Sequence, residues 1–292
     1  MIENPKIVGV IGHPIKHSLS PFMHNTAFKL AGLNYVYLSF DVVQSQLKNA
    51  LKGIIALDIK GLNVTIPFKE TILEFLDEIS EEASVVGAVN TIVNESGKLF
   101  GYNTDTNGVL ETLHPFKEKI KEKEITVLGA GGAARSVIYI LIRKFNPTRI
   151  NIINRTLQRA ETLADYFASK MNFSNFATFE LLPPDIVNTL SNSSLIVNTT
   201  SAGLYPKTDD VPFELGEAFN ENQIVFDVIY NPLKTKFLQI AESKNAHILN
   251  GLTMFLEQGA KAYELWTGKT MPKAKIYLEL EKKLKEVENV SD

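Results

Sequence analysis

Four short segments in the first third of the chain bring together hydroxyl, amide, amine and carboxylate side chains. They are SLSP (18–21), NVTIPFK (63–69), NT (90–91) and NTD (103–105). The two serines can cap a helix or bind an anion such as a carboxylate. The second segment places a hydroxyl and an ammonium after an apolar run, and ligands bind where the strands of an open α/β sheet end. Each segment alone also has a structural explanation, because Asn and Asp favour turns and Lys is usually solvated.

A glycine-rich turn, GAGGAA (129–134), follows the apolar run ITVL and precedes an apolar helical pattern. Glycines in that context allow a tight turn and let a pyrophosphate approach the backbone at a helix N-terminus. Asn154 and Arg155 end the next predicted strand, Thr156 follows them, and Arg159 lies one turn into the next predicted helix. A guanidinium and a hydroxyl suit the 2′-phosphate of NADP, whereas NAD usually meets a carboxylate there. The pattern therefore predicts an NADP site. The alternative is that the glycine turn serves only packing and that the arginines are solvated surface charges.

Composition excludes several other chemistries. The chain has no cysteine, which excludes disulfides, thiol catalysis, iron–sulfur clusters and Cys-ligated zinc, and is consistent with a cytoplasmic protein. Its five histidines form no H-E-x-x-H pair, so we predict no metal. With 30 basic and 33 acidic residues, the formal charge of −3 gives no reason to expect nucleic acid or a membrane surface as partner. The apolar run at 7–12 is too short for a secretory signal, and no stretch has the length of a membrane span.

The chemistry-bearing segments must be positioned by alternating strands and helices. At 292 residues, with 45% hydrophobic residues, the chain is long enough for about two domains with cores of their own. Strands are predicted at 6–12, 35–42, 59–67, on both sides of the NESG turn at 94–97, and at 125–128, 149–155, 193–200, 223–230 and 246–250. Helices are predicted at 21–32, 44–57, near 69–79, at 106–124, at 156–170, and at the C-terminus with Ile276, Leu280 and Leu284 on one face. This alternation predicts mostly parallel sheets with crossover helices, and the charged segment 106–124 is a candidate connection between two domains.

Taken together, the motifs resemble the shikimate dehydrogenase family over nearly the whole chain. The resemblance is carried by the order and spacing of IGHPIKHSLSP, NVTIPFK, GAVNT, GYNTDTNG, GAGGAA, NRTLQRA and NGLTMFLEQ. It implies reversible, NADP-dependent interconversion of 3-dehydroshikimate and shikimate in the shikimate pathway, which leads to chorismate and the aromatic amino acids. It also implies two α/β domains with the active site in the cleft between them. A mostly parallel sheet domain for substrate would comprise 1–106 plus 251–292, and a Rossmann-like NADP-binding domain would comprise 107–250.

The resemblance also implies roles for individual residues. The substrate carboxylate would be held by Ser18, Ser20 and Tyr230. The ring hydroxyls would be contacted by Thr65, Lys69, Asn90, Asp105 and Gln258. NADP would be held by Gly129, Ala130, Gly131, Gly132, Ala133, Asn154, Arg155, Thr156 and Arg159, with Val228 and Gly251 near the nicotinamide. One local variation is Thr106-Asn107, since many relatives of this type have other residues after NTD.

Lys69 is the predicted acid/base group, and Asp105 is predicted to orient both Lys69 and the substrate. Hydride transfer from a secondary alcohol needs a base to remove the hydroxyl proton, and His, Tyr or Lys can serve. A protonated lysine suits the reverse reaction, because it gives its proton to the forming alkoxide. His13, His17 and His24 lie near the serines in sequence, and we expect them to pack or to support the site.

Alternatives remain open at this stage. A dual-specificity quinate/shikimate dehydrogenase, with NAD in place of NADP, belongs to the same superfamily. A catalytically silent NADP-binding regulatory module is a different class, against which the intact Lys69 and Asp105 argue. If Lys69 is not the base, His13 or Tyr230 is the next candidate. The sequence is compatible with a monomer or a homodimer.

Overall fold

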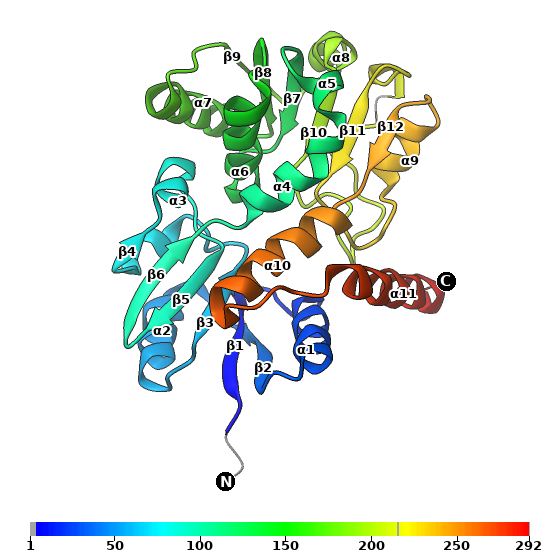
Figure 1. Cartoon of the computed structure of the whole chain (residues 1–292). Helices are drawn as coiled ribbons and strands as arrows, with labels where there is room; N and C mark the ends of the chain where they lie inside the picture. The colour runs from blue at the N-terminus through cyan, green and yellow to red at the C-terminus, as the bar shows by residue number, and fades with distance from the viewer. Residues whose placement is uncertain (1–3, 215, 292) are drawn as a thin grey trace. The chain divides into compact units, whose positions relative to one another are not determined.

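The computed structural model describes residues 4–214 and 216–291. The chain forms two compact units: one comprises Met1–Gly108 with Leu256–Lys282, and the other comprises Val109–Phe255 with Lys283–Asp292. Each unit has a six-stranded sheet of its own, as Figure 1 shows. This confirms the predicted two-domain α/β fold. No helix among the described residues is both long and apolar enough to cross a membrane.

The first unit is built on a sheet with the strand order β2-β1-β3-β5-β6-β4. Its strands are β1 (Lys6–Gly12), β2 (Tyr35–Asp41), β3 (Gly61–Val64), β4 (Glu78–Ile79), β5 (Thr91–Glu95) and β6 (Lys98–Tyr102). Strands β2, β1 and β3 are parallel, β4 is parallel to β6, and β5 is antiparallel to both of its neighbours. The sheet is therefore mostly parallel, as predicted, and the antiparallel hairpin turns at the NESG segment.

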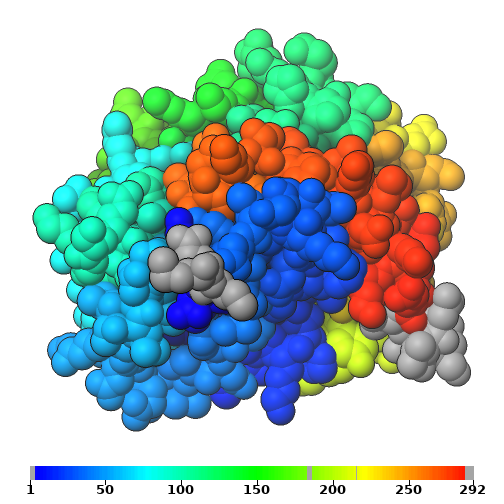
Figure 2. Space-filling view, turned by 60° about the horizontal axis from the view of Figure 1, so that its bottom comes forward, coloured from blue at the N-terminus to red at the C-terminus, as the bar shows by residue number. Residues whose placement is uncertain are grey.

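Helices α1 (Ser20–Ala31), α2 (Leu47–Ala56) and α3 (Glu81–Val86) connect these strands. Helix α1 ends where the sequence predicts, because Gly32 adopts the left-handed conformation with φ of 63°. The buried side of α2, Leu47, Leu51 and Ile54, joins a core cluster on one side of the sheet. Helix α10 (Leu252–Thr267) packs against α1 near its middle, since a Cβ on Gly259 would meet Met23 at 2.1 Å. Figure 2 shows α10 in orange against the blue N-terminal segments.

The segment 69–79 differs from the predicted helix. It forms a short 3-10 helix, η2 (Thr71–Phe75), followed by β4. The physical reason is a pair of contacts to β6: the Asp77 amide donates to the Leu99 carbonyl at 3.0 Å, and the Leu99 amide donates to the Asp77 carboxylate at 2.7 Å. These contacts hold the chain extended where an α-helix would continue. The periodicity of the apolar residues could not predict this pairing.

The second unit has an all-parallel sheet with the strand order β12-β11-β10-β7-β8-β9. Its strands are β7 (Glu124–Leu128), β8 (Arg149–Asn154), β9 (Phe176–Glu180), β10 (Leu195–Asn198), β11 (Ile224–Asp227) and β12 (His247–Leu249). The order starts at β7 and runs outward in both directions, which is the doubly wound arrangement of Rossmann domains. Such sheets bind ligands at the carboxyl ends of the strands where the order reverses, here between β7 and β10.

Two apolar clusters cover the two faces of this sheet. Alternate residues of one strand face opposite sides: Val127 belongs to one cluster and Leu128 to the other. Helices α6 (Gly132–Ile140) and α7 (Leu157–Met171) contribute to the first cluster. Helices α8 (Pro183–Asn192) and α9 (Lys236–Glu242) contribute to the second.

Three helices cross the boundary between the units along the chain. They are α4 (Asp105–Leu113), α10 and α11 (Lys273–Ser291). Segment 106–124, predicted as helical, comprises most of α4, a 3-10 turn and the short helix α5 (Lys117–Ile120). The predicted face of α11 is confirmed, because Ile276, Leu280 and Leu284 are all fully buried.

Candidate active site

Lys69 is held in place by the chain on both sides of it. Phe68, the preceding residue, is fully buried in the core and closes a tight turn, because its amide donates to the Thr65 carbonyl at 2.9 Å. The Lys69 carbonyl accepts a hydrogen bond from the Val89 amide at 2.8 Å. The side chain is only 17% exposed, and its Nζ donates to Asp105 Oδ2 at 2.5 Å. The predicted pair of Lys69 and Asp105 therefore forms within the first unit.

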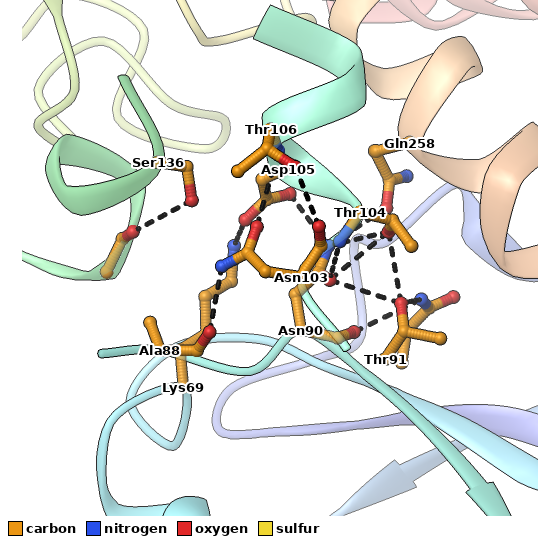
Figure 3. A network of polar contacts seen from close by, with 12 residues as sticks. Lys69, Ala88, Asn90, Thr91, Asn103, Thr104, Asp105, Thr106, Ser136 and Gln258 are labelled. Atoms are coloured by element: carbon orange, nitrogen blue, oxygen red, sulfur yellow. Dashed lines mark hydrogen bonds and ion pairs between the residues drawn. The ribbon is translucent and has the colours of Figure 1, made fainter. Parts of the chain in front are cut away.

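Asp105 begins α4 and is surrounded by amide and hydroxyl groups (Figure 3). Its Oδ1 accepts a hydrogen bond from Asn90 Nδ2 at 2.9 Å, and its position in the first turn of α4 suits a negative charge. The same Nδ2 lies 3.0 Å from the Thr104 hydroxyl and 3.5 Å from Gln258 Oε1. Four of the predicted substrate-contacting residues, Lys69, Asn90, Asp105 and Gln258, are thus connected in one polar network.

Supporting residues complete this network. Asn90 Oδ1 accepts the Thr104 amide at 2.7 Å, and Asn103 Nδ2 donates to the Ala88 carbonyl at 2.9 Å. The hydroxyl of Thr106, at the position of sequence variation, donates to the Asn103 carbonyl at 2.8 Å. Thr106 therefore fixes the start of α4. Asn103 and Thr104 had no separate role predicted from the sequence, although polar residues at the end of an apolar segment are a usable signal for such a role.

The hydroxyl groups predicted to meet the substrate lie in the same unit. Ser18 Oγ accepts the Ser20 amide at 3.3 Å, whereas the N-cap residue of α1, Leu19, supplies no side-chain cap. Within the described part of the chain, the hydroxyls of Ser20 and Thr65 have no hydrogen-bond partner. Ser18 thus does serve helix α1 in part, while Ser20 keeps its hydroxyl available to a ligand.

Two of the histidines near the serines, His13 and His24, have different surroundings. His13 is exposed and contacts Asp41 at 2.7 Å. His24 is fully buried and stacks on Tyr37, with 4.4 Å between ring centroids. Neither nitrogen of His24 has a hydrogen-bond partner, and burial lowers its pKa to about 3. His24 is therefore neutral and packs in the core, as the sequence analysis expects.

In the second unit, the glycine turn follows β7 at the point where the strand order reverses. Gly129 has φ of 102°, a conformation that other residues rarely adopt, and a Cβ there would meet the Thr199 hydroxyl at 2.7 Å. A Cβ on Gly131 would point into open space, and the first turn of α6 has no acidic residue. The Gly129 amide itself donates to the Ile153 carbonyl at 2.8 Å. The backbone N–H groups that follow it, up to Ala133, lie at the N-terminus of α6, which fits a pyrophosphate.

The basic residues after β8 fit a second phosphate group. Arg155, Thr156 and Arg159 are exposed, and the first turn of α7 contains no acidic residue. Neither arginine forms an ion pair with another part of the described chain. Asn154 Nδ2 donates to the Thr156 carbonyl at 2.9 Å and so shapes the turn that presents these side chains. The two cations are available for a ligand such as the 2′-phosphate of NADP.

Val228, Tyr230 and Gly251 lie on segments that touch each other. The Gly251 amide donates to the Ile229 carbonyl at 2.9 Å, and a Cβ on Gly251 would lie 2.1 Å from the Val228 carbonyl oxygen. Only glycine permits this approach. The Tyr230 ring stacks on Phe255, with 4.1 Å between centroids.

Comparisons with known proteins agree with this geometry. Three family models match: the shikimate dehydrogenase substrate binding domain at residues 10–92, shikimate/quinate 5-dehydrogenase at 111–228, and the shikimate 5′-dehydrogenase C-terminal domain at 251–277. The NADP(+) shikimate dehydrogenase of Methanocaldococcus jannaschii is 46% identical over 265 residues, covering 90% of this chain and 92% of the relative.

Solved structures are similar over almost the full length. A shikimate dehydrogenase in complex with NADP+ has a TM-score of 0.88 and 43% identity, with 96% of each chain covered. Shikimate 5-dehydrogenase from Thermus thermophilus, in complex with NADP(H) and shikimate, has a TM-score of 0.82 and 35% identity. That comparison covers 95% of this chain and 99% of the other.

Proposed function

This chain belongs to the shikimate dehydrogenase family, and we propose that it catalyses the reversible, NADPH-dependent reduction of 3-dehydroshikimate to shikimate. It is an oxidoreductase that acts on a CH–OH group and serves the shikimate pathway. One observation of this structure carries the proposal: a largely buried ammonium, Lys69, contacts the carboxylate of Asp105 inside a network of neutral amides and hydroxyls. That combination offers a proton donor beside groups that can recognise a hydroxylated ring.

Lys69 is the proposed acid/base group, and Asp105 fixes its position. An ammonium has three N–H donors, and the contact with Asp105 leaves the others for the oxygen of the reacting carbon. In reduction, Lys69 gives a proton to the forming alkoxide; in oxidation, the neutral amine takes the proton back. The carboxylate also compensates the burial of the ammonium.

Recognition of the ring uses several neutral donors and acceptors. We propose that Thr65, Asn90, Asp105 and Gln258 contact the ring hydroxyls and that Ser18, Ser20 and Tyr230 hold the carboxylate. A wrong isomer would leave some of these buried polar groups without a partner, which gives strong discrimination.

The cofactor of this reaction is NADP, and the residues described above fit it. When bound, NADPH supplies the hydride for reduction. The glycine turn from Gly129 to Ala133 would hold the pyrophosphate, and Asn154, Arg155, Thr156 and Arg159 would hold the 2′-phosphate side of the adenosine. The backbone at Val228 and Gly251 would line the nicotinamide end.

Other predictions from the sequence accompany this function. We propose that residues 1–106 with 251–292 bind substrate and that 107–250 bind NADP. The partners are small molecules. The absence of a nucleic-acid partner, a monomeric or homodimeric state and a cytoplasmic location stay predictions.

The test is an assay of nicotinamide absorbance that crosses shikimate and quinate with NADP and NAD. We expect rapid oxidation of shikimate with NADP and slower turnover in the other three combinations. Equal rates with quinate would instead indicate a dual-specificity enzyme. Binding of NADP without turnover of either substrate would contradict the proposal and favour a regulatory module.

A further inference from the structure

Asp227 is a fully buried carboxyl group that has no part in the proposed binding or proton transfer. It ends β11, and both of its oxygens accept hydrogen bonds. Oδ1 accepts from Asn198 Nδ2 and from the Ile229 amide, both at 3.1 Å, and Oδ2 accepts from the Thr235 hydroxyl at 2.7 Å. The donors come from the end of β10, from the residue after Val228, and from the start of α9.

Burying a carboxyl group at this position costs free energy of desolvation. No lysine, arginine or histidine in the described chain forms an ion pair with Asp227, so its burial is compensated by neutral donors alone. An apolar residue would avoid that cost and could satisfy none of the three donors. A carboxylate accepts at two oxygens and can satisfy all three, which accounts for its presence.

The hydrogen bond from Thr235 to Asp227 joins the two ends of a loop. The loop runs from Asp227 to Thr235, and the Thr235 hydroxyl also caps α9 by accepting the Leu238 amide at 3.3 Å. Asn198 extends the connection to the neighbouring strand, and its Oδ1 accepts the Thr200 amide and hydroxyl. The closed loop carries Val228 and Tyr230.

We propose that Asp227 is a positioning residue, which closes the 227–235 loop so that the Val228 backbone and the Tyr230 ring take the places that the reaction requires. The inference rests on the proposed function, because the roles of Val228 and Tyr230 belong to it. The stack of Tyr230 on Phe255 fixes the ring from its other side, so the loop closure and the stack together define where the phenol oxygen lies.

The first test compares Asp227→Ala with Asp227→Asn. The alanine removes every acceptor, whereas the asparagine keeps one oxygen for Asn198 and Ile229 and donates from its nitrogen to the Thr235 hydroxyl. We expect Asp227→Ala to lower kcat/KM for shikimate about 100-fold, the scale of a displacement near the reacting groups, with most of the loss in KM. NADP affinity, measured by fluorescence titration, should change little. Asp227→Asn should restore most of the activity, and Asp165→Ala on the exposed side of α7 is the matched control.

The second test asks whether Asp227 acts through Tyr230. Loss of the phenol hydroxyl in Tyr230→Phe should cost much less in the Asp227→Ala background than in the wild-type chain, because the ring is then already displaced. Additive losses would overturn the inference. So would an Asp227→Ala protein that unfolds at lower temperature but keeps its KM for shikimate.

A readout without activity separates this inference from the proposed function. Hydrogen exchange measured by mass spectrometry over residues 228–235 should become at least about tenfold faster in Asp227→Ala and stay near wild type in Asp227→Asn, as expected when local hydrogen bonds are lost. Unchanged exchange in Asp227→Ala would overturn the inference. If the wild-type chain turns over no shikimate while the exchange differs as expected, the proposed function fails and the loop-closing role of Asp227 stands.

Discussion

At the scale of single residues, Lys69 and Asp105 act as one unit. Each is held by its own segment: Lys69 by the turn after β3, and Asp105 by the start of α4 and by Asn90. Their contact joins the two segments at the point where a proton must move. Removing either residue therefore disturbs the other.

The first prediction concerns this pair. Lys69→Ala should lower turnover by about 10²–10⁴-fold, the range of a positioned acid/base group, with a smaller effect on shikimate affinity. Asp105→Asn should also reduce turnover, and the double variant should lose little more than the worse single one. The pH profile of shikimate oxidation should lose its ascending limb in Lys69→Ala. Lys60→Ala is the control, since the Lys60 ammonium contacts the exposed carboxylate of Asp58 and is no part of the network around Asp105. If Lys69→Ala keeps near-normal turnover and the ascending limb of its pH profile, His13 or Tyr230 would be the acid/base group instead.

The second prediction concerns the two unpaired arginines. Arg155→Ala should raise the KM for NADP about 10- to 100-fold, because a charge-assisted hydrogen bond to phosphate is worth about 1.5–3 kcal/mol. The KM for NAD, which lacks the 2′-phosphate, should barely change. Arg149→Ala, at the start of the strand β8 that Arg155 follows, should alter neither constant. An equal effect on NADP and NAD would contradict the assignment.

At the scale of elements, one close contact fixes the end of α10 on the first sheet. Trp266 Nε1 donates to the Ile92 carbonyl at 3.0 Å, and the Tyr35 hydroxyl donates to the Trp266 carbonyl at 3.1 Å. The indole fits only because residue 61 is glycine: a Cβ there would lie 2.2 Å from Trp266 Nε1. Helix α10 also carries Gln258, so its seating affects the polar network.

The third prediction tests this contact. Gly61→Ala should destabilise the protein by about 1–3 kcal/mol, the usual cost of an extra group in a packed core. Gly53→Ala is the matched control: its Cβ would meet nothing within 4 Å, so the change within α2 should be neutral or stabilising by up to about 1 kcal/mol. Denaturant titration can follow Trp266 directly, because it is the only tryptophan in the chain. Equal stability of the two variants would contradict this account of the indole.

At the scale of the whole molecule, each unit contains a buried group whose pKa is strongly shifted, His24 in the first and Asp227 in the second, and the two respond oppositely to pH. Burial lowers the pKa of His24 from 6.5 to about 3. The unfolded chain therefore takes up a proton below pH 6.5 that the folded chain refuses, and stability falls as the solution is acidified. Burial raises the pKa of Asp227 from 3.8 to about 6, against the opposing effect of its hydrogen bonds. The contribution of Asp227 is fully present below pH 3.8 and is lost as pH rises through 6.

The fourth prediction follows from these signs. Between about pH 6 and pH 4, His24 should lower the free energy of unfolding by up to about 1.4 kcal/mol per pH unit, while Asp227 raises that of its own unit by a similar amount. His24→Phe keeps the ring stack and should remove the acid-induced loss in the first unit. Asp227→Asn should remove the opposing trend in the second. Hydrogen exchange of core peptides from each unit, measured across this range, checks both signs. A first unit equally acid-sensitive with and without His24 would contradict the prediction.

The sequence by itself determined the features that rest on local chemistry. Gly32 ends α1 because glycine adopts the left-handed conformation easily, and the spacing of Ile276, Leu280 and Leu284 defines the buried face of α11. The glycine turn after ITVL and the polar residues after apolar runs also pointed to the carboxyl ends of strands. The family resemblance then supplied roles for those residues, and the comparisons confirm the family and the two-domain α/β fold.

Only the tertiary structure decided which distant residues meet. The pairing of Asp77 with Leu99 made a strand where periodicity predicted a helix. The need for glycine at position 61 comes from the indole of Trp266, which is far away in the sequence. Asn198 and Asp227 end two different strands and Thr235 precedes a helix, so no local pattern joins them. Local propensity acts over a few residues, whereas burial and hydrogen bonding select partners by position in space. The sequence therefore predicts the turns, the buried faces of helices and the chemical groups. The contacts that hold those groups in place form only when the chain folds.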